Sequence, residues 1–285
     1  MKKNIVCKLS LDGSPSSEFS GMCSSLASVN EGILIWNEKE KPAWDMFYEY
    51  SPDILVCLDK DLSKAISSAT NEYKNTKVVV FGTNFDPEFR VDLVCDKEID
   101  DSSQSMRLLP SANIVDFNHS SAKHKDGYAT EVLILEEKLN EIMNAMHQFN
   151  MKIFSLKDRV YHQNYIGTID PKKLPVAVSS CNVFADLSGN SDMICNVMAM
   201  KIPCLSATNC FIDSEYMPIP ADLEDFMNYL RTLLYKEEFA KKHTAKCYDY
   251  ILSNYTYFHR ASELYEKLGY DEFSKESLDA IKNYL

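Results

Sequence analysis

Residues 165–209 read YIGTIDPKKLPVAVSSCNVFADLSGNSDMICNVMAMKIPCLSATN, and this stretch decides the expected fold. Its apolar side chains alternate between short runs of the kind found in buried strands and longer patterns at helical spacing. The expected strands and helices are 165–168, 171–181, 183–187, 192–200 and 204–207. Strands that alternate with helices form parallel sheets, because each connection between parallel neighbours needs a crossover. The stretch therefore predicts a layered α/β domain.

The same alternation extends towards the N-terminus in two blocks. The first block has expected strands at 4–9, 32–36, 53–58, 77–81 and 91–95, with helices at 16–29, 43–50 and 62–73. A polar, serine-rich segment at 100–128, broken by Pro110, separates it from a second block with strands at 132–135 and 152–156 and a helix at 139–149. Two Rossmann-like parallel-sheet domains are the expected architecture.

Beyond Pro218 and Pro220 the pattern becomes wholly helical. The expected helices are 222–235, 237–255, 260–268 and 274–284. We therefore predict an N-terminal domain at 1–115, a second domain at 116–220, and a helical segment at 221–285 that packs across both.

Composition excludes several kinds of protein. The 285 residues include only 8 glycines, and no two of these stand two positions apart, so neither a G-x-G-x-x-G nor a P-loop phosphate motif exists. The net charge of −12 is shared equally by residues 1–130 and 131–285, so neither half is a basic nucleic-acid-binding domain. Nine cysteines without a C-x-x-C and the lack of an apolar run of ~18–20 residues predict a cytoplasmic protein that does not insert into membranes.

The stretch 165–209 resembles the donor-binding core of GT-B glycosyltransferases, in particular the spore-maturation-like and group 1 types. The resemblance rests on a strand ending at Gly167, the polar turn 188–191, the helical step Val197-Met198-Ala199-Met200, and Ile202-Pro203-Cys204. It implies a two-domain GT-B fold whose closing helical segment packs back on the first domain. It also implies transfer of a sugar from a nucleotide-sugar, expected to be a UDP-sugar, to an acceptor in the interdomain cleft, with no metal cofactor required.

The acceptor is left open by this resemblance. Small transferases of the fold modify glycans, proteins or hydroxymethylated bases of viral DNA, and the last case would place the protein in the cytoplasm of an infected host. The charge balance gives a DNA acceptor no support.

The expected donor site centres on the turn Ser188-Gly189-Asn190-Ser191. Free backbone N–H groups at the start of a helix favour a bound diphosphate, and glycine permits close approach. Asn196 stands where the resembled family commonly has a ribose-binding glutamate. The remaining expected donor contacts are Lys138 and Lys157 for the diphosphate, and Tyr165 and Gly167 in the strand 165–168.

Two departures from the group 1 pattern concern this same site. The positions of its two glutamates hold Ser188 and Asn196, and Glu136-Glu137 precede Lys138 where the family has a glycine-containing turn. These departures favour a second hypothesis from another class, a GT-B-shaped binding or assembly protein without catalysis. This second hypothesis predicts a donor pocket filled by the side chains of Glu136, Met193 or Asn196.

Three residues are candidates for proton transfer. Asp12 and Glu18 flank the loop after the first strand, which faces the cleft in GT-B proteins, so either could be a general base. His119, with His124 nearby, lies in the polar segment and has the near-neutral pKa that proton transfer needs. The structural alternatives are an ordinary helix entry around Pro15 and solvated histidines.

Asp59-Lys60-Asp61 follows an expected strand and has the D-x-D form that binds a divalent metal in the GT-A fold. The structural alternative is that Asp61 caps the helix beginning at residue 62. The metal hypothesis predicts loss of activity with EDTA, whereas the GT-B hypothesis predicts none.

Overall fold

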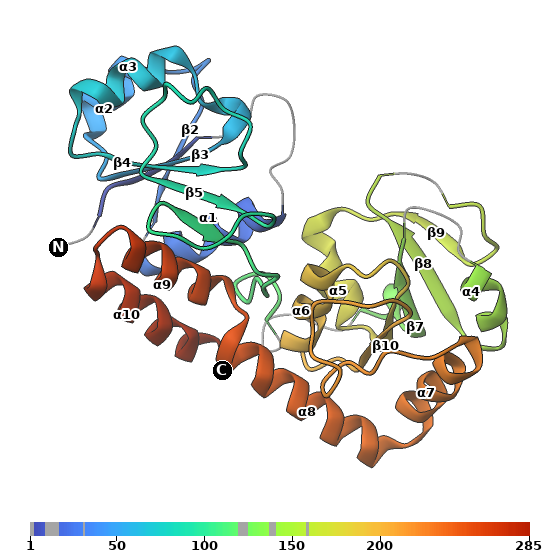
Figure 1. Ribbon diagram of the computed structural model, residues 1–285. Helices are drawn as coiled ribbons and strands as arrows, with labels where there is room; N and C mark the ends of the chain where they lie inside the picture. The colour runs from blue at the N-terminus through green and yellow to red at the C-terminus, as the bar shows by residue number, and fades with distance from the viewer. Residues whose placement is uncertain (1–2, 9–16, 31, 119–124, 137–140, 158–159) are drawn as a thin grey trace. The chain divides into compact units, whose positions relative to one another are not determined.

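A computed structural model describes residues 3–8, 17–30, 32–118, 125–136, 141–157 and 160–285 (Figure 1). The chain forms two compact units, each built around one parallel sheet. Met1–Leu109 and Tyr257–Asn283 make the first unit, and Pro110–Thr256 make the second. The predicted fold class, two parallel α/β domains with a C-terminal helical segment, is confirmed. None of the described helices combines the length and apolar character needed to span a bilayer.

The first unit has a six-stranded parallel sheet in the order β2-β1-β3-β4-β5-β6. Its strands are β1 (Ile5–Lys8), β2 (Leu34–Trp36), β3 (Ile54–Leu58), β4 (Lys77–Phe81), β5 (Leu93–Asp96) and β6 (Ser105–Arg107). Its helices are α1 (Ser17–Asn30), α2 (Ala43–Tyr50), α3 (Lys64–Glu72), α9 (Tyr257–Lys267) and α10 (Asp271–Ala280), with single turns η1 (Asp59–Asp61) and η5 (Ile281–Tyr284). The central strands are apolar on both faces because helices cover both faces.

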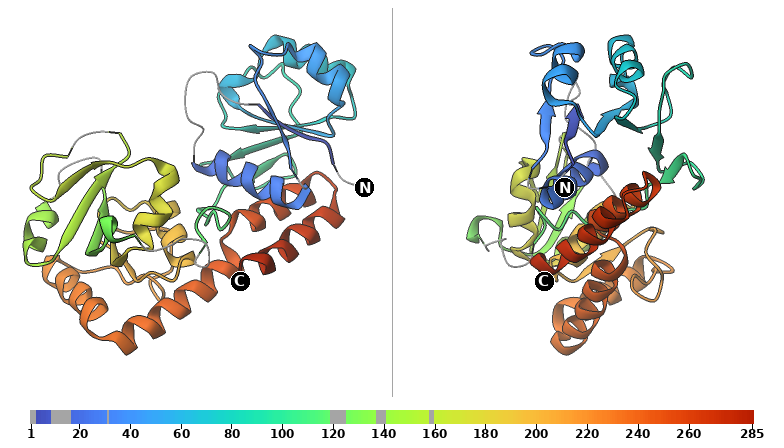
Figure 2. Two further views of the ribbon diagram at one scale, coloured as in Figure 1. Left: turned by 180° about the vertical axis from the view of Figure 1, so that it is seen from behind. Right: turned by 90° about the vertical axis from the view of Figure 1, so that its left-hand side faces the viewer.

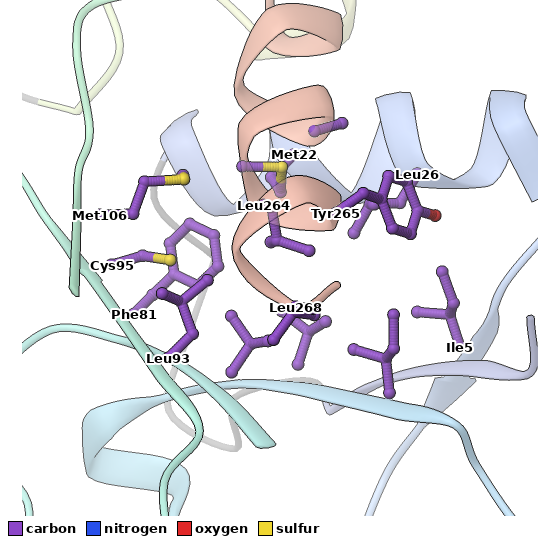
Figure 3. Close-up of a cluster of buried hydrophobic side chains, with 14 of the residues drawn as sticks. Ile5, Met22, Leu26, Phe81, Leu93, Cys95, Met106, Leu264, Tyr265 and Leu268 are labelled. Carbon is purple, nitrogen blue, oxygen red and sulfur yellow. The ribbon is translucent and has the colours of Figure 1, made fainter. Parts of the chain in front are cut away.

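The two last helices complete the core of the first unit. Figure 3 shows Leu264 and Tyr265 of α9, and Leu268 directly after it, packed together with Ile5 of β1 and Leu93 of β5. Seen from behind, α9 and α10 lie side by side next to α1 (Figure 2). The sheet face that α1 alone would leave open is therefore covered by residues more than 150 positions away in sequence.

The second unit has a five-stranded parallel sheet in the order β11-β10-β7-β8-β9. Its strands are β7 (Thr130–Leu135), β8 (Met151–Ser155), β9 (Tyr165–Thr168), β10 (Cys181–Asp186) and β11 (Cys204–Ser206). Its helices are α4 (Glu141–Ala145), α5 (Leu174–Val178), α6 (Ser191–Ala199), α7 (Leu223–Tyr235) and α8 (Glu237–Asn254), with turns η2 (Asp126–Tyr128), η3 (Met146–Gln148) and η4 (Pro171–Lys173). Helix α7 adds Phe226 and Leu230 to the core.

The polar segment 100–128 is more ordered than its composition indicates. It contains strand β6, and Ser111 and Ala112 are fully buried in the second unit. The amide of Ala112 donates to the carbonyl of Tyr255 at 2.7 Å, and Ala112 forms a parallel bridge with Thr256. These backbone bonds put the division between the units at Leu109/Pro110 and Thr256/Tyr257, whereas the sequence placed it at 115/116 and treated 221–285 as one segment.

Candidate functional site

The strands of the second unit present their carboxyl ends at a single edge of the sheet. Strand β7 lies between β10 and β8. The chain continues from β7 to β8 and β9 on one side of β7 and then crosses to β10 on its other side, so the strand order reverses there. In open parallel sheets, ligands bind outside the carboxyl ends at such a reversal. The segments that follow β8, β10 and β11 therefore line the candidate site.

A buried carboxylate organises the turn after β10. Asp186, the last residue of β10, is only 2% exposed. Its Oδ2 accepts hydrogen bonds from the Ser206 hydroxyl at 2.6 Å and from the Gly189 amide at 2.8 Å. Its Oδ1 accepts from the Asn190 amide at 3.1 Å and from the Ser188 hydroxyl at 3.3 Å. Four donors satisfy the buried charge, which is the condition for keeping it there.

This network changes the interpretation of the turn 188–191. The expectation that the amides of Gly189 and Asn190 are free for a diphosphate is wrong, because both already donate to Asp186. The side chain of Asn190 caps α6 by accepting from the amide of Met193 at 3.1 Å. What the turn offers a ligand is the exposed side chains of Ser188 and Asn190 and the positive end of the α6 dipole.

Gly189 is required by both backbone conformation and close packing. Its φ of +79° lies in the left-handed region, and a Cβ there would approach the Thr208 hydroxyl to 2.7 Å and the Asn209 carbonyl to 3.2 Å. The turn after β10 thus packs directly against the segment after β11. Ser191 joins the same two segments, since its hydroxyl accepts from the amide of Phe211 at 3.1 Å.

Two side chains of α6 hold the segment that enters the second unit. Asp192 Oδ1 accepts from the amide of Ser111 at 3.3 Å, and Asn196 Oδ1 accepts from the amide of Asn113 at 2.7 Å. Both side chains lie on one face of the helix, four residues apart. The carbonyl oxygen that the resemblance assigns to a ribose therefore binds the protein's own backbone, and Asn196 is only 9% exposed.

The other expected donor residues are spread along the same edge. Lys157 is exposed beyond the carboxyl end of β8, and Lys138 lies outside the described residues. The Tyr165 hydroxyl hydrogen bonds with Ser155 at 2.9 Å, which places it at the end of β8. Gly167 has a φ of +147° and open space around its Cβ position. The assignment of these residues to a donor stays a prediction.

Of the expected proton-transfer residues, only Glu18 belongs to the described residues. Asp12, His119 and His124 lie outside them. Glu18, in the first turn of α1, forms an ion pair with Lys97 and lines a groove of the first unit.

The D-x-D candidate, Asp59-Lys60-Asp61, takes part in the protein's own hydrogen bonds and secondary structure. Asp59 accepts the amides of Lys60 at 2.6 Å and Asn84 at 2.9 Å, and Asp61 lies inside η1. The cap of α3 is Ser63, whose hydroxyl accepts from the amide of Ile66, so Asp61 does not have the capping role expected of it. Among the described residues, no three His, Cys, Asp or Glu side chains gather as metal ligands.

Asp186 is the organising residue that the sequence analysis missed. An acidic residue at the end of an otherwise apolar strand, followed by S-G-N-S, was the available signal. A carboxylate in that position accepts the amides of the turn that follows it, as an Asx-type turn does. Ser206 is the last residue of β11 and lies opposite Asp186 in the sheet. Its hydrogen bond to Asp186 could not be predicted without this β10–β11 register.

Comparison with known proteins identifies the architecture. No protein-family model matches the chain, and no curated protein matches its sequence. An α-glucosyltransferase solved in complex with UDP and a 13-mer DNA with an A:G mismatch aligns over 96% of this chain and 99% of its own, at 9% identity and a TM-score of 0.63. Anabaena Alr3699/HepE in complex with UDP-glucose aligns over 94% and 99%, at 10% identity and a TM-score of 0.57.

A putative UDP-N-acetylglucosamine 2-epimerase from Listeria monocytogenes aligns over 95% of this chain and 98% of its own, at 12% identity and a TM-score of 0.57. In each case the alignment covers nearly the whole chain and therefore both units, while sequence identity is at background level. The chain therefore has the two-domain GT-B fold.

Proposed function

We propose that the protein is a glycosyltransferase that takes its sugar from a UDP-sugar bound at the carboxyl edge of the second unit. The observation that carries the proposal is the full-length GT-B fold, shared with proteins crystallised with UDP or UDP-glucose. The polar turn at the reversal of strand order supports the same location.

In this proposal the turn 188–191 acts as a rigid platform for the donor's diphosphate. Asp186 holds the turn in place, so the exposed side-chain amide of Asn190, whose oxygen caps α6, can donate hydrogen bonds at the amino end of that helix. The helix dipole and the exposed ammonium of Lys157 favour the negative charge that develops on the leaving diphosphate. Rate acceleration then depends on positioning and on leaving-group stabilisation, and activity is expected to persist in EDTA.

Calorimetric titration with UDP, UDP-glucose and UDP-N-acetylglucosamine tests the donor site. The informative variant is Asn190→Asp, because aspartate is an equally good N-cap and keeps the hydrogen bond to Met193. The added carboxylate repels a diphosphate, so we expect UDP affinity to fall about five- to tenfold.

Asn182→Asp is the matched control. Asn182 is exposed near the amino end of β10, the strand that precedes the turn, and it undergoes the same chemical change. UDP affinity of this variant should equal that of the wild type. Equal affinities in all three proteins, or no UDP binding by the wild type, would remove the proposed donor site.

A second function, a GT-B-shaped binding or assembly protein without catalysis, is favoured by one observation. The backbone amides of Gly189 and Asn190 donate to Asp186, and the side-chain oxygen of Asn196 accepts from the amide of Asn113, so these groups already have partners within the protein. This function predicts that UDP-sugars are not consumed. Release of UDP from UDP-sugars, measured with amine, glycan and hydroxymethylcytosine-DNA acceptors, separates it from the transferase.

A further inference from the structure

The first unit carries a groove at the carboxyl ends of β3, β4 and β5. Its volume is about 600 Å³, within the range of small-molecule sites and large enough for a mono- or disaccharide. All of its lining residues belong to the first unit. Carboxyl edges of parallel sheets are where α/β proteins bind ligands, so the position itself favours a substrate site.

The floor of the groove is apolar and consists of closely packed core side chains. Phe81 at the end of β4 is 5% exposed, and its ring packs edge-on against Phe19 at 5.4 Å between centroids. Leu58 and Leu108 extend this floor. Gly82, also in the lining, has a φ of +104° and leaves no room for a Cβ, which would lie 2.4 Å from the Asp59 carboxylate. The floor can pack against the apolar face of a ring.

The rim of the groove has an excess of negative charge. It holds the carboxylates of Glu18, Asp96 and Glu98 and the ammonium of Lys97. Lys97 is paired with Glu18, whereas no ion pair joins Asp96 or Glu98 to a cation within the described ranges. Asp96 is fixed by accepting the amide of Glu98 at 2.9 Å. A ligand that carries a phosphate backbone would be repelled, and one that carries an ammonium group would be attracted.

We infer that this groove binds the acceptor, and that the acceptor is a cationic, amine-bearing molecule of saccharide size. The inference rests on the proposed transferase function and narrows its acceptor class. An ammonium group pairs with Asp96 and Glu98 while the ring lies on Phe81. A DNA acceptor is disfavoured by the same two carboxylates.

Three monosaccharides of nearly equal shape and different charge test the inference. Glucosamine, glucose and glucuronate are titrated separately into the full-length, ¹⁵N-labelled protein at about pH 6.5, where the amine is protonated. Amide shifts of Gly82, Thr83 and Ile99 report occupancy of the groove. We expect glucosamine to bind about fivefold or more tightly than glucose, and glucuronate to bind most weakly.

The double variant Asp96→Asn/Glu98→Gln should reduce the preference for glucosamine to less than about twofold, because both rim charges are removed without changing side-chain size. Asp86→Asn/Glu88→Gln is a matched control, since Asp86 also accepts the amide of the glutamate two residues on, at 3.0 Å, outside the groove. This control should keep the full preference. Equal binding of the three sugars by the wild type, or an unchanged preference in the Asp96/Glu98 variant, overturns the inference.

A titration with a hydroxymethylcytosine-containing DNA duplex tests the alternative acceptor. Groove shifts caused by this DNA, and not by glucosamine, would also overturn the inference. The titrations contain no UDP, so the groove can fail while UDP binding at the second unit stands, and UDP binding can fail while the groove preference stands. The two proposals are thus tested by separate measurements.

Discussion

Gly189 and Asp186 determine the shape of the turn before α6. The glycine accepts a left-handed φ and the close approach of Thr208, and the carboxylate accepts the amides that this shape exposes. The polar turn and its location at a helix start could be predicted from the sequence. The direction of its amides could not, because it depends on a buried carboxylate and on a serine of the neighbouring strand.

Substitution of Gly189 by alanine separates packing from backbone conformation. Gly269 has the same φ of +79°, but nothing lies within 4 Å of its Cβ position. Gly269→Ala should cost about 1–2 kcal/mol of unfolding free energy, the price of a left-handed residue, and Gly189→Ala at least about 1 kcal/mol more because of the contact with Thr208. Urea unfolding measures both, and equal losses would argue against the close approach.

Helices α1 and α9 pack against each other, and Gly21 of α1 is a point of very close approach. A Cβ on Gly21 would lie 2.4 Å from the Tyr257 ring. Alanine is favoured over glycine by about 1 kcal/mol in a helix interior, so without this contact Gly21→Ala would stabilise the protein. We expect it instead to destabilise the protein by about 1–3 kcal/mol, measured by urea unfolding. A gain in stability would show that α9 does not pack against α1 at this position.

Helix α8 carries a half-buried histidine, His243, that makes stability depend on pH. The pKa of His243 is lowered from its ordinary value, first by burial and then by the nearby Lys246. Its Nε2 lies 3.3 Å from the Tyr229 hydroxyl and 3.5 Å from Cys247 Sγ. Because the unfolded state takes up the proton more readily, stability is lost as the pH falls through and below about 6.5.

The His243→Gln variant tests this dependence. Between about pH 7.5 and about pH 5.5, the melting temperature of the wild type should fall more than that of the variant, since glutamine cannot take up a proton. Thermal melts at both pH values supply the comparison. The account of α8 is contradicted if the two proteins lose the same number of degrees.

The whole molecule is built from two units whose chain segments are interleaved. The fold class and most strands were predictable from apolar runs, and strands 77–81 and 165–168 match β4 and β9 residue for residue. Strand β6 and the buried segment 111–114 were not predicted. They contain polar side chains and are held by backbone hydrogen bonds to distant residues, which an apolar pattern does not reveal. The assignment of α9 and α10 to the first unit depends on tertiary packing that no local pattern contains.

Truncation after Thr256 tests this interleaving. It removes Leu264, Tyr265, Leu268 and Phe273 from the core of the first unit, and each large buried side chain contributes about 1.5–3 kcal/mol. We expect the first unit to unfold while the second, complete at residues 110–256, retains protected amides in hydrogen exchange. Protection of β1 and β3 in the truncated chain would contradict the packing of α9 on this sheet.

The proposal that the second unit binds a UDP-sugar is tested most directly by a crystal structure of the protein soaked with UDP. We predict the diphosphate at the amino end of α6, within hydrogen-bonding distance of the side-chain amide of Asn190, with Asp186 still holding the turn. UDP bound elsewhere on either unit, or an empty turn at a UDP concentration that saturates calorimetric binding, would contradict the proposal.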